Sequence, residues 1–120
     1  MVKQRRKLWL KLSAHGREIP VYVVNVVDGD DSGGEYDYEN NRINIKSSPN
    51  IHEMKSALHH EFHHVFFDGC SGDVRQRVLG PKTVKGRAQR EEQIVSYLEP
   101  VSYDILVRNG FLKYPDPPTL

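Results

Sequence analysis

Two histidines and a glutamate lie close together near the middle of the chain. Histidine is a common metal ligand, and glutamate can accept and donate a proton. The three residues lie in His60-Glu61-Phe62-His63-His64, an H-E-x-x-H sequence. On an α-helix, residues four apart lie one above the other, so His60 and His64 can present two imidazoles to one metal ion. Glu61, at the border of that face, can reach a water held by the ion. Zinc hydrolases generate hydroxide near neutral pH in this way. The sequence therefore predicts that His60 and His64 bind Zn²⁺ and that Glu61 is the general base.

The residues around the motif predict a partly buried amphipathic helix. At 100° per residue, the three motif residues fall in a polar strip beside an apolar sector. That sector holds Ile51, Met54, Leu58, Phe62, Val65 and Phe66. Asn50 and Glu53, three residues apart, form a variant of a capping box at the start, and Gly69 provides a stop. The extra histidines, His59 and His63, lie on the flank of the helix and are expected to pack or to face solvent.

A catalytic zinc ion usually takes three protein ligands and keeps one position open for water. Glu91 is our choice for the third ligand, because it shares a helical stripe with apolar residues such as Ile94 that would pack on the motif helix. Glu92 is the alternative if that helix is rotated by one residue. Cys70 is the rival, since it occupies the position of the third histidine in H-E-x-x-H-x-x-G-x-x-H enzymes. Phe67, however, stands where those enzymes have glycine, and a small buried thiol is the simpler interpretation of the cysteine.

Length and composition describe a single globular domain over residues 1–120. The chain is 38% hydrophobic and 28% charged, which is typical of a soluble protein, and its net charge of +1 predicts no particular partner. It has no run of about 18 apolar residues, so no membrane span is expected. One cysteine excludes an intramolecular disulfide, and an N-terminus without an apolar signal core favours the cytoplasm.

The order of the elements predicts an α+β fold. Short strands are expected at 9–12 and 19–27, followed by a hairpin that turns at Glu39-Asn40-Asn41 and leads into the motif helix. A last helix is expected from Gln89 to Val107, kinked or split by Pro100, with a stripe formed by Ile94, Val95, Leu98, Val101 and Ile105. We therefore expect a small antiparallel or mixed sheet packed on the motif helix, with a second helix toward the C-terminus. An edge strand of the hairpin could bind an extended peptide by strand addition.

Three segments outside these elements are predicted to lie on the surface and to contribute little to the core. Residues 1–7 are a basic flexible terminus, and residues 114–120 form an extended, proline-rich tail. Residues 71–88 are a basic loop, which we interpret as a solvated segment with, at most, a short helix at Val74 to Leu79. The competing interpretation of this loop is a basic rim that recruits an acidic partner or nucleic acid.

Three stretches of the chain, taken together, resemble small HExxH proteins encoded in phages and prophages. The stretches are Tyr36 to Ile45, Leu58 to Asp68 and Glu91 to Pro100. These proteins look like minimal gluzincin metallopeptidases, distantly similar to the metallopeptidases that cleave prophage repressors and to SprT-like proteases. The resemblance implies zinc held by His60, His64 and a glutamate near residue 91, in the cytoplasm of a host cell.

The sequence thus favours a zinc-dependent metallopeptidase that hydrolyses peptide bonds of a protein substrate through a zinc-activated water. Glu61 would take the proton of that water and return it to the leaving amine. The alternative is a non-catalytic zinc-binding module that binds a regulator or nucleic acid through its basic loop. An open coordination position distinguishes the two, because structural zinc sites are closed by a fourth protein ligand.

Overall fold

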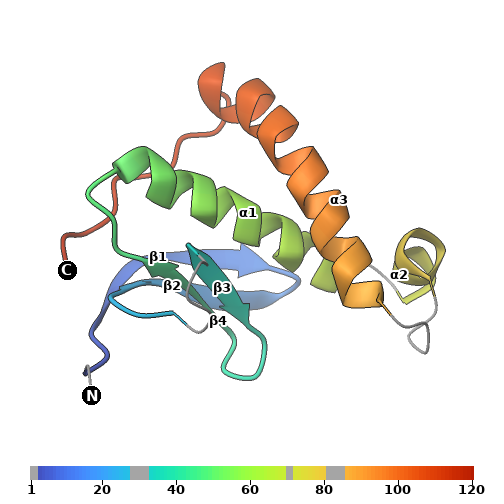
Figure 1. The fold of residues 1–120 in the computed structure, drawn as a ribbon, viewed down its shortest axis with the longest axis horizontal. Helices are drawn as coiled ribbons and strands as arrows, with labels where there is room; N and C mark the ends of the chain where they lie inside the picture. The colour runs from blue at the N-terminus through green and yellow to red at the C-terminus, as the bar shows by residue number, and fades with distance from the viewer. Residues whose placement is uncertain (1–2, 28–32, 70–71, 81–85) are drawn as a thin grey trace. The chain divides into compact units, whose positions relative to one another are not determined.

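The chain forms a four-stranded mixed sheet and several helices, an α+β fold as predicted (Figure 1). The computed structural model describes residues 3–27, 33–69, 72–80 and 86–120. The strands are β1 (Arg6–Ala14), β2 (Arg17–Val24), β3 (Gly34–Asp37) and β4 (Arg42–Lys46). The helices are α1 (Ile51–Gly69), α2 (Gly72–Leu79), α3 (Arg87–Ser102) and a π-helix, η1 (Tyr103–Arg108).

The elements divide into two compact units. The first unit holds Met1–Glu61 with Tyr114–Leu120, and the second holds Phe62–Lys113. The boundary falls inside α1, which is continuous across it. The strands and the first half of α1 therefore belong to the first unit, and the second half of α1 belongs with α2, α3 and η1.

The sheet of the first unit has the strand order β1-β2-β4-β3. β1 pairs antiparallel with β2, β2 pairs parallel with β4, and β3 pairs antiparallel with β4, so β3 is an edge strand. The two central strands supply the core with the fully buried side chains of Ile19, Val21, Val23, Ile43 and Ile45. Figure 1 shows the first half of α1 lying over one face of this sheet. Its buried Met54 and Leu58 complete the apolar layer.

The β3–β4 hairpin confirms the predicted turn. Asn41 occupies the left-handed region at φ 52°, a conformation that Asn tolerates better than most residues. The start of β3 favours glycine, because a Cβ on Gly34 would lie 2.8 Å from Cδ1 of Ile45 and 3.1 Å from the carbonyl oxygen of Asn44. A side chain at this position would force the end of the Ile45 side chain to move and would crowd the carbonyl group of the neighbouring strand.

The start of α1 has the predicted cap. Oδ1 of Asn50 accepts hydrogen bonds from the backbone N–H groups of His52 at 3.0 Å and Glu53 at 3.4 Å. The Glu53 carboxylate does not complete the usual capping box; it accepts a hydrogen bond from the hydroxyl of Ser48 at 3.0 Å, and that hydroxyl accepts from the N–H of Asn50. The helix is thus fixed at its N-terminus by side chains that the sequence placed there.

Segments near both chain ends make more contacts within the first unit than their composition indicated. β1 begins at Arg6, so the prediction of a flexible terminus over 1–7 was wrong at its end. Residues 114–120 contain no helix or strand, as expected of an extended tail. The tail is tied to β1, since the indole N–H of Trp9 donates to the carbonyl oxygen of Pro115 at 3.1 Å.

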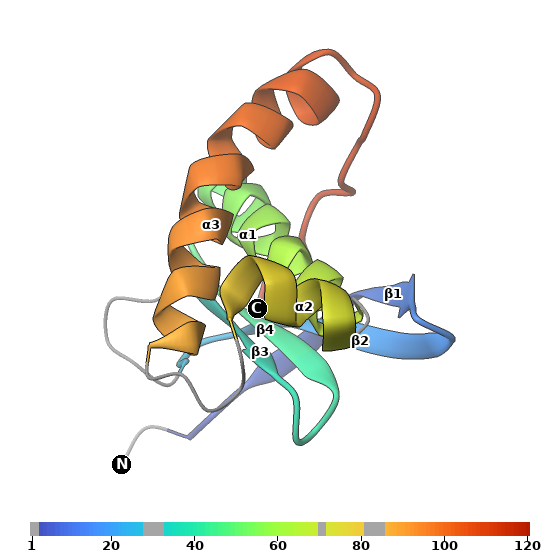
Figure 2. The same cartoon turned by 90° about the vertical axis from the view of Figure 1, so that its right-hand side faces the viewer.

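The last helix does not break where the sequence predicted. α3 runs through Pro100 without interruption, and the irregularity appears three residues later as the π winding of η1. Proline removes one N–H donor but leaves the rest of the helix ladder intact. Figure 2 shows α3 continuing into η1, with α2 beside its first turns. α2 lies within the segment predicted as a basic loop, where the sequence allowed a short helix from Val74 to Leu79. The carbonyl of its last residue, Leu79, accepts a 2.7 Å hydrogen bond from Nε of Arg90.

The predicted apolar stripe of α3 is buried over only part of its length. Val95 is fully buried, but Leu98, Val101 and Ile105 are about half exposed, so the prediction that the whole stripe packs was wrong. The buried residues of α3 are instead Glu91 and Val95, which lie one turn apart on the same side of the helix.

Two residues assigned to the apolar sector of α1 are not buried. Met54, Leu58 and Val65 are buried, whereas Ile51 and Phe66 are 41% and 74% exposed. Ile51 is the first residue of α1 and Phe66 lies in its last turn, and the three buried residues lie between them. Among the residues that the structure describes, no helix combines the length and the apolar character needed to cross a membrane.

Candidate metal centre

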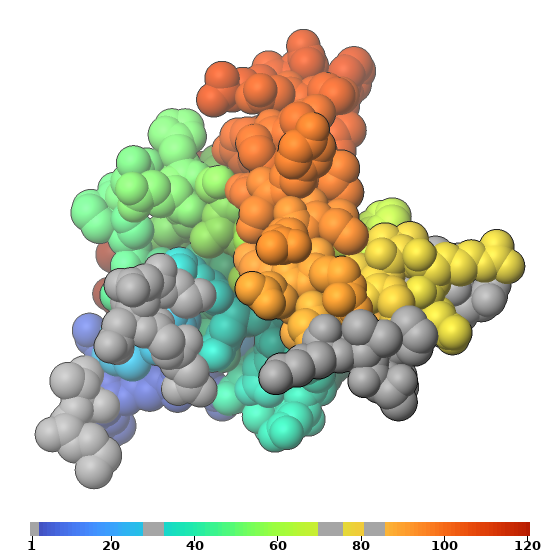
Figure 3. Space-filling view, turned by 45° about the vertical axis from the view of Figure 1, so that its right-hand side comes forward, coloured from blue at the N-terminus to red at the C-terminus, as the bar shows by residue number. Residues whose placement is uncertain are grey.

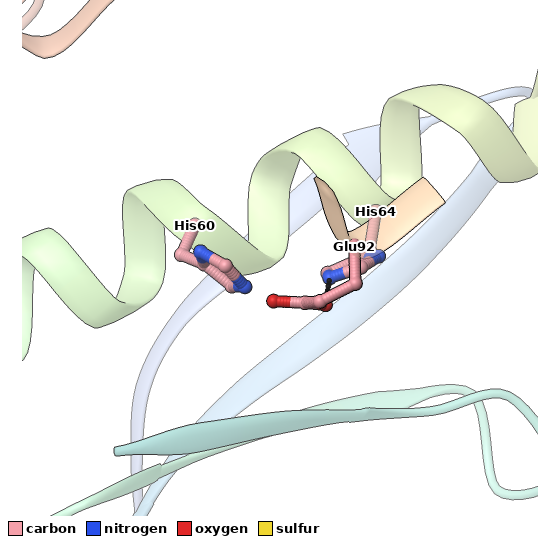
Figure 4. Close-up of side chains that lie close together, drawn as sticks. All are labelled: His60, His64 and Glu92. Carbon is pink, nitrogen blue, oxygen red and sulfur yellow. Dashed lines mark ion pairs between the residues drawn. The ribbon is translucent and has the colours of Figure 1, made fainter. Parts of the chain in front are cut away.

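The two motif histidines extend from the same side of α1. The helix is unbroken from Ile51 to Gly69, so His60 and His64 are separated by one turn. Both are partly buried. Figure 4 shows their imidazole rings on one side of the helix, with the carboxylate of Glu92 beside them. The i, i+4 spacing of the motif therefore brings the two imidazole rings to the same side of α1.

Glu92, on the first turns of α3, completes a group of three potential ligands. One ligand atom each from His60, His64 and Glu92 lies within 4.8 Å of the others. Nε2 of His64 and Oε2 of Glu92 lie 2.7 Å apart. The Glu92 side chain is 51% exposed, so the group is open to solvent on this side.

Glu91, the ligand chosen from the sequence, contacts the other nitrogen of the same imidazole. Its Oε2 lies 2.8 Å from Nδ1 of His64. Both side chains are nearly buried, at 9% exposed for Glu91 and 12% for His64. A carboxylate on Nδ1 holds a proton there, orients the ring and directs Nε2 toward the group. Glu92, the alternative third ligand, thus lies with the two histidines. Glu91 lies on the other edge of the His64 ring, at Nδ1.

The donor set fits a zinc ion. Two imidazoles and a carboxylate are the ligands of one class of catalytic zinc site, and three is the number that leaves a position for water. The ligand atoms of His60, His64 and Glu92 already lie within 4.8 Å of one another, so rotation of these side chains would allow all three residues to bind one ion. Cys70, the rival ligand, lies outside the described residues.

Glu61 lies in the first unit and is 6% exposed. It follows His60 directly and is therefore rotated by about 100° from the line of the two histidines. Its Cγ is 3.6 Å from the point that a Cβ of Gly34 would occupy, so the side chain lies beside the edge strand β3.

The two flanking histidines have structural partners that the sequence did not identify. His59 is buried, and its Nδ1 lies 2.5 Å from the hydroxyl of Tyr114 in the C-terminal tail. Nε2 of His63 lies 3.0 Å from the hydroxyl of Ser102, which donates to the carbonyl oxygen of Glu99 at 3.2 Å. His63 therefore ties α1 to the end of α3, and His59 ties α1 to the tail. Only long-range contacts define these roles, and no local pattern signals them.

No protein-family model, curated protein or solved structure matches the chain. The resemblance to phage-encoded HExxH proteins therefore stays a prediction.

Proposed function

We propose that the protein is a zinc-dependent metallopeptidase. The observation that carries the proposal is the group formed by His60, His64 and Glu92, whose ligand atoms lie within 4.8 Å of one another. The group has the composition and the ligand number of a catalytic zinc site, and its half-exposed Glu92 gives it access to solvent. An acid–base residue, Glu61, adjoins one ligand in the sequence.

The chain's own residues have distinct tasks in this proposal. His60, His64 and Glu92 hold the ion, and Glu91 fixes the ring of His64 through Nδ1. When bound, zinc polarises the scissile carbonyl and makes a coordinated water acidic near neutral pH. Glu61 accepts a proton from the attacking water and returns it to the leaving amine nitrogen as the C–N bond breaks. Burial of Glu61 excludes bulk water as a competing proton carrier.

The edge strand β3 is the part of the sheet suited to hold an extended peptide. It lies at the end of the strand order, and strand addition at such an edge supplies backbone hydrogen bonds regardless of side-chain sequence. The proximity of Gly34 to Glu61 favours this location, because a peptide added along β3 would pass the proposed base. The substrate class in this proposal is therefore an unfolded or extended segment of a protein.

Metal content and coordination test the proposal first. We expect one zinc per chain, and zinc-edge X-ray absorption showing two imidazoles, one carboxylate and a water. A sulfur ligand without a water would instead indicate a closed structural site that includes Cys70, and the protein would then be a zinc-binding interaction module. Absence of bound zinc after reconstitution would remove the basis of the proposal.

Hydrolysis of a peptide library, read by mass spectrometry, tests the chemistry. Glu61→Gln is expected to bind zinc like the unaltered protein and to lose cleavage, because a neutral amide cannot accept the proton. Glu53→Gln is the matched control: the same substitution on the same helix, at an exposed position whose contact with Ser48 an amide oxygen can retain. Undiminished cleavage by Glu61→Gln would refute the assigned mechanism.

A further inference from the structure

One stretch of the second unit exposes large apolar side chains at an unusual density. Tyr97 is 79% exposed, Leu98 45%, Val101 54%, Ile105 54% and Leu106 39%. We call these five residues the α3–η1 strip. Phe111, 79% exposed, follows at the end of η1. Exposed apolar residues are ordinary when scattered, but a run of this kind marks an interaction surface.

The π winding of η1 gathers the strip onto one side. Each residue turns the chain by 100° in α3 but by only about 80° in the wider η1. With this change of pitch, the five residues fall in a sector about 100° wide. In a regular α-helix Leu106 would lie outside that sector. Glu91 and Ser102 lie on the neighbouring side of the helix. They contact His64 and His63 of α1 within the second unit. The strip is therefore separate from the metal centre.

We propose that the strip is a homodimer interface, occupied by the same strip of a second copy of this chain. Its area is sufficient. The exposed fractions correspond to on the order of 500 Å² of apolar side-chain surface per copy, before Phe111 is added. A standard interface buries about 800 Å² per partner, of which somewhat more than half is apolar.

The charges around the strip suit a self-complementary contact. Asp104 and Arg108 flank it and are paired with each other at 3.0 Å along the helix, so they bring no unpaired like charges to a two-fold axis. The whole chain carries a net charge of +1, which gives two copies little mutual repulsion. Antiparallel pairing about a two-fold axis sets the Tyr97 end of one strip against the Ile105 end of the other. Figure 3 shows the part of the surface formed by α3.

Sedimentation velocity from low micromolar to a few hundred micromolar protein tests this inference. We expect a monomer–dimer equilibrium in the micromolar range, and Val101→Lys or Ile105→Lys to raise the dimer Kd by about a hundredfold or more, because each places an unpaired cation in the interface. Both positions are half exposed and lie in the C-terminal half of the α3–η1 helix, where lysine is compatible with folding. Val78→Lys is the matched control, a valine of α2 that is 50% exposed.

Concentration-dependent amide chemical shifts give an independent readout that needs no substitution. Shifts confined to residues 97–111 support the strip as the contact. A monomer at every concentration would overturn the inference, and so would a dimer that persists in both lysine variants or shifts located elsewhere. The measurement does not depend on zinc, so its failure leaves the proposed peptidase untouched.

Discussion

Substitution of the two neighbouring glutamates by glutamine should weaken zinc binding to clearly different extents. Glu92→Gln replaces a proposed ligand carboxylate with an amide oxygen, a poor ligand for zinc. Glu91→Gln leaves every proposed ligand in place and changes only the group on Nδ1 of His64. The two substitutions are chemically identical and one residue apart, so each serves as the control for the other.

The expected sizes follow from the contacts. The bond from His64 to Glu91 is 2.8 Å long between nearly buried side chains, and such charge-assisted bonds contribute about 1.5–3 kcal/mol. Loss of its charge should therefore weaken zinc affinity by about 10- to 100-fold, the usual range for a residue that orients a ligand. Binding of zinc at a four-ligand site contributes about 10–16 kcal/mol, or roughly 2.5–4 kcal/mol per ligand. Loss of the Glu92 ligand should therefore weaken zinc affinity by about 70- to 900-fold.

Competition with a chromophoric chelator at fixed neutral pH measures both affinities, with Glu53→Gln as a variant expected to bind normally. A larger loss for Glu91→Gln than for Glu92→Gln would reverse the two roles and restore Glu91 as the ligand. Equal affinities for all three variants would show that neither glutamate serves a metal, and the reasoning from the His64 contacts would fail.

Three further predictions concern stability. Gly34→Ala should lower the free energy of unfolding by about 1–3 kcal/mol in urea titrations, because its Cβ would overlap Cδ1 of Ile45 and crowd the carbonyl oxygen of Asn44; an unchanged midpoint would contradict the close approach. Tyr114→Phe leaves the buried Nδ1 of His59 without its hydroxyl partner and should cost about 1–3 kcal/mol, and a cost below about half a kcal/mol would show that the tail does not restrain α1. The hydrogen bond from Asn40 lowers the pKa of Asp37 below its ordinary 3.8, so the carboxylate stabilises the fold above that pH and ceases to do so as the pH falls through the lowered pKa. Thermal melts should therefore show Asp37→Asn less stable than the unaltered protein at pH 6, and this difference should shrink in acid rather than grow.

Much of the first unit could be predicted because its determinants are local. The β-branched run of β2 has few alternatives to a buried strand. The cap at Asn50 depends on side chains two and three residues from the backbone groups that they satisfy. The turn of the β3–β4 hairpin is specified by residues that tolerate a left-handed conformation, such as Asn41.

The second unit was less predictable because its arrangement depends on packing between helices. A helical wheel shows which residues share a face but not how wide a face is covered, so Leu98 and Val101 were assigned to the core. Pro100 was expected to kink or split the helix; it does not split it, and propensity alone does not fix the point at which the winding changes. His59 contacts Tyr114, 55 positions later in the chain, and His63 contacts Ser102, 39 positions later. No periodic pattern in the sequence indicates such distant partners.

The choice between Glu91 and Glu92 illustrates the same limit and its physical origin. Consecutive side chains on a helix diverge by about 100°, so the two carboxylates cannot point to the same place. They can, however, contact opposite edges of one imidazole, and the structure uses both, with the buried Glu91 on Nδ1 and the half-exposed Glu92 on Nε2. The wheel correctly selected the inward-facing glutamate. A ligand of a catalytic zinc must instead reach a site open to solvent, so the more exposed of two neighbouring glutamates is the better candidate where an imidazole lies between them.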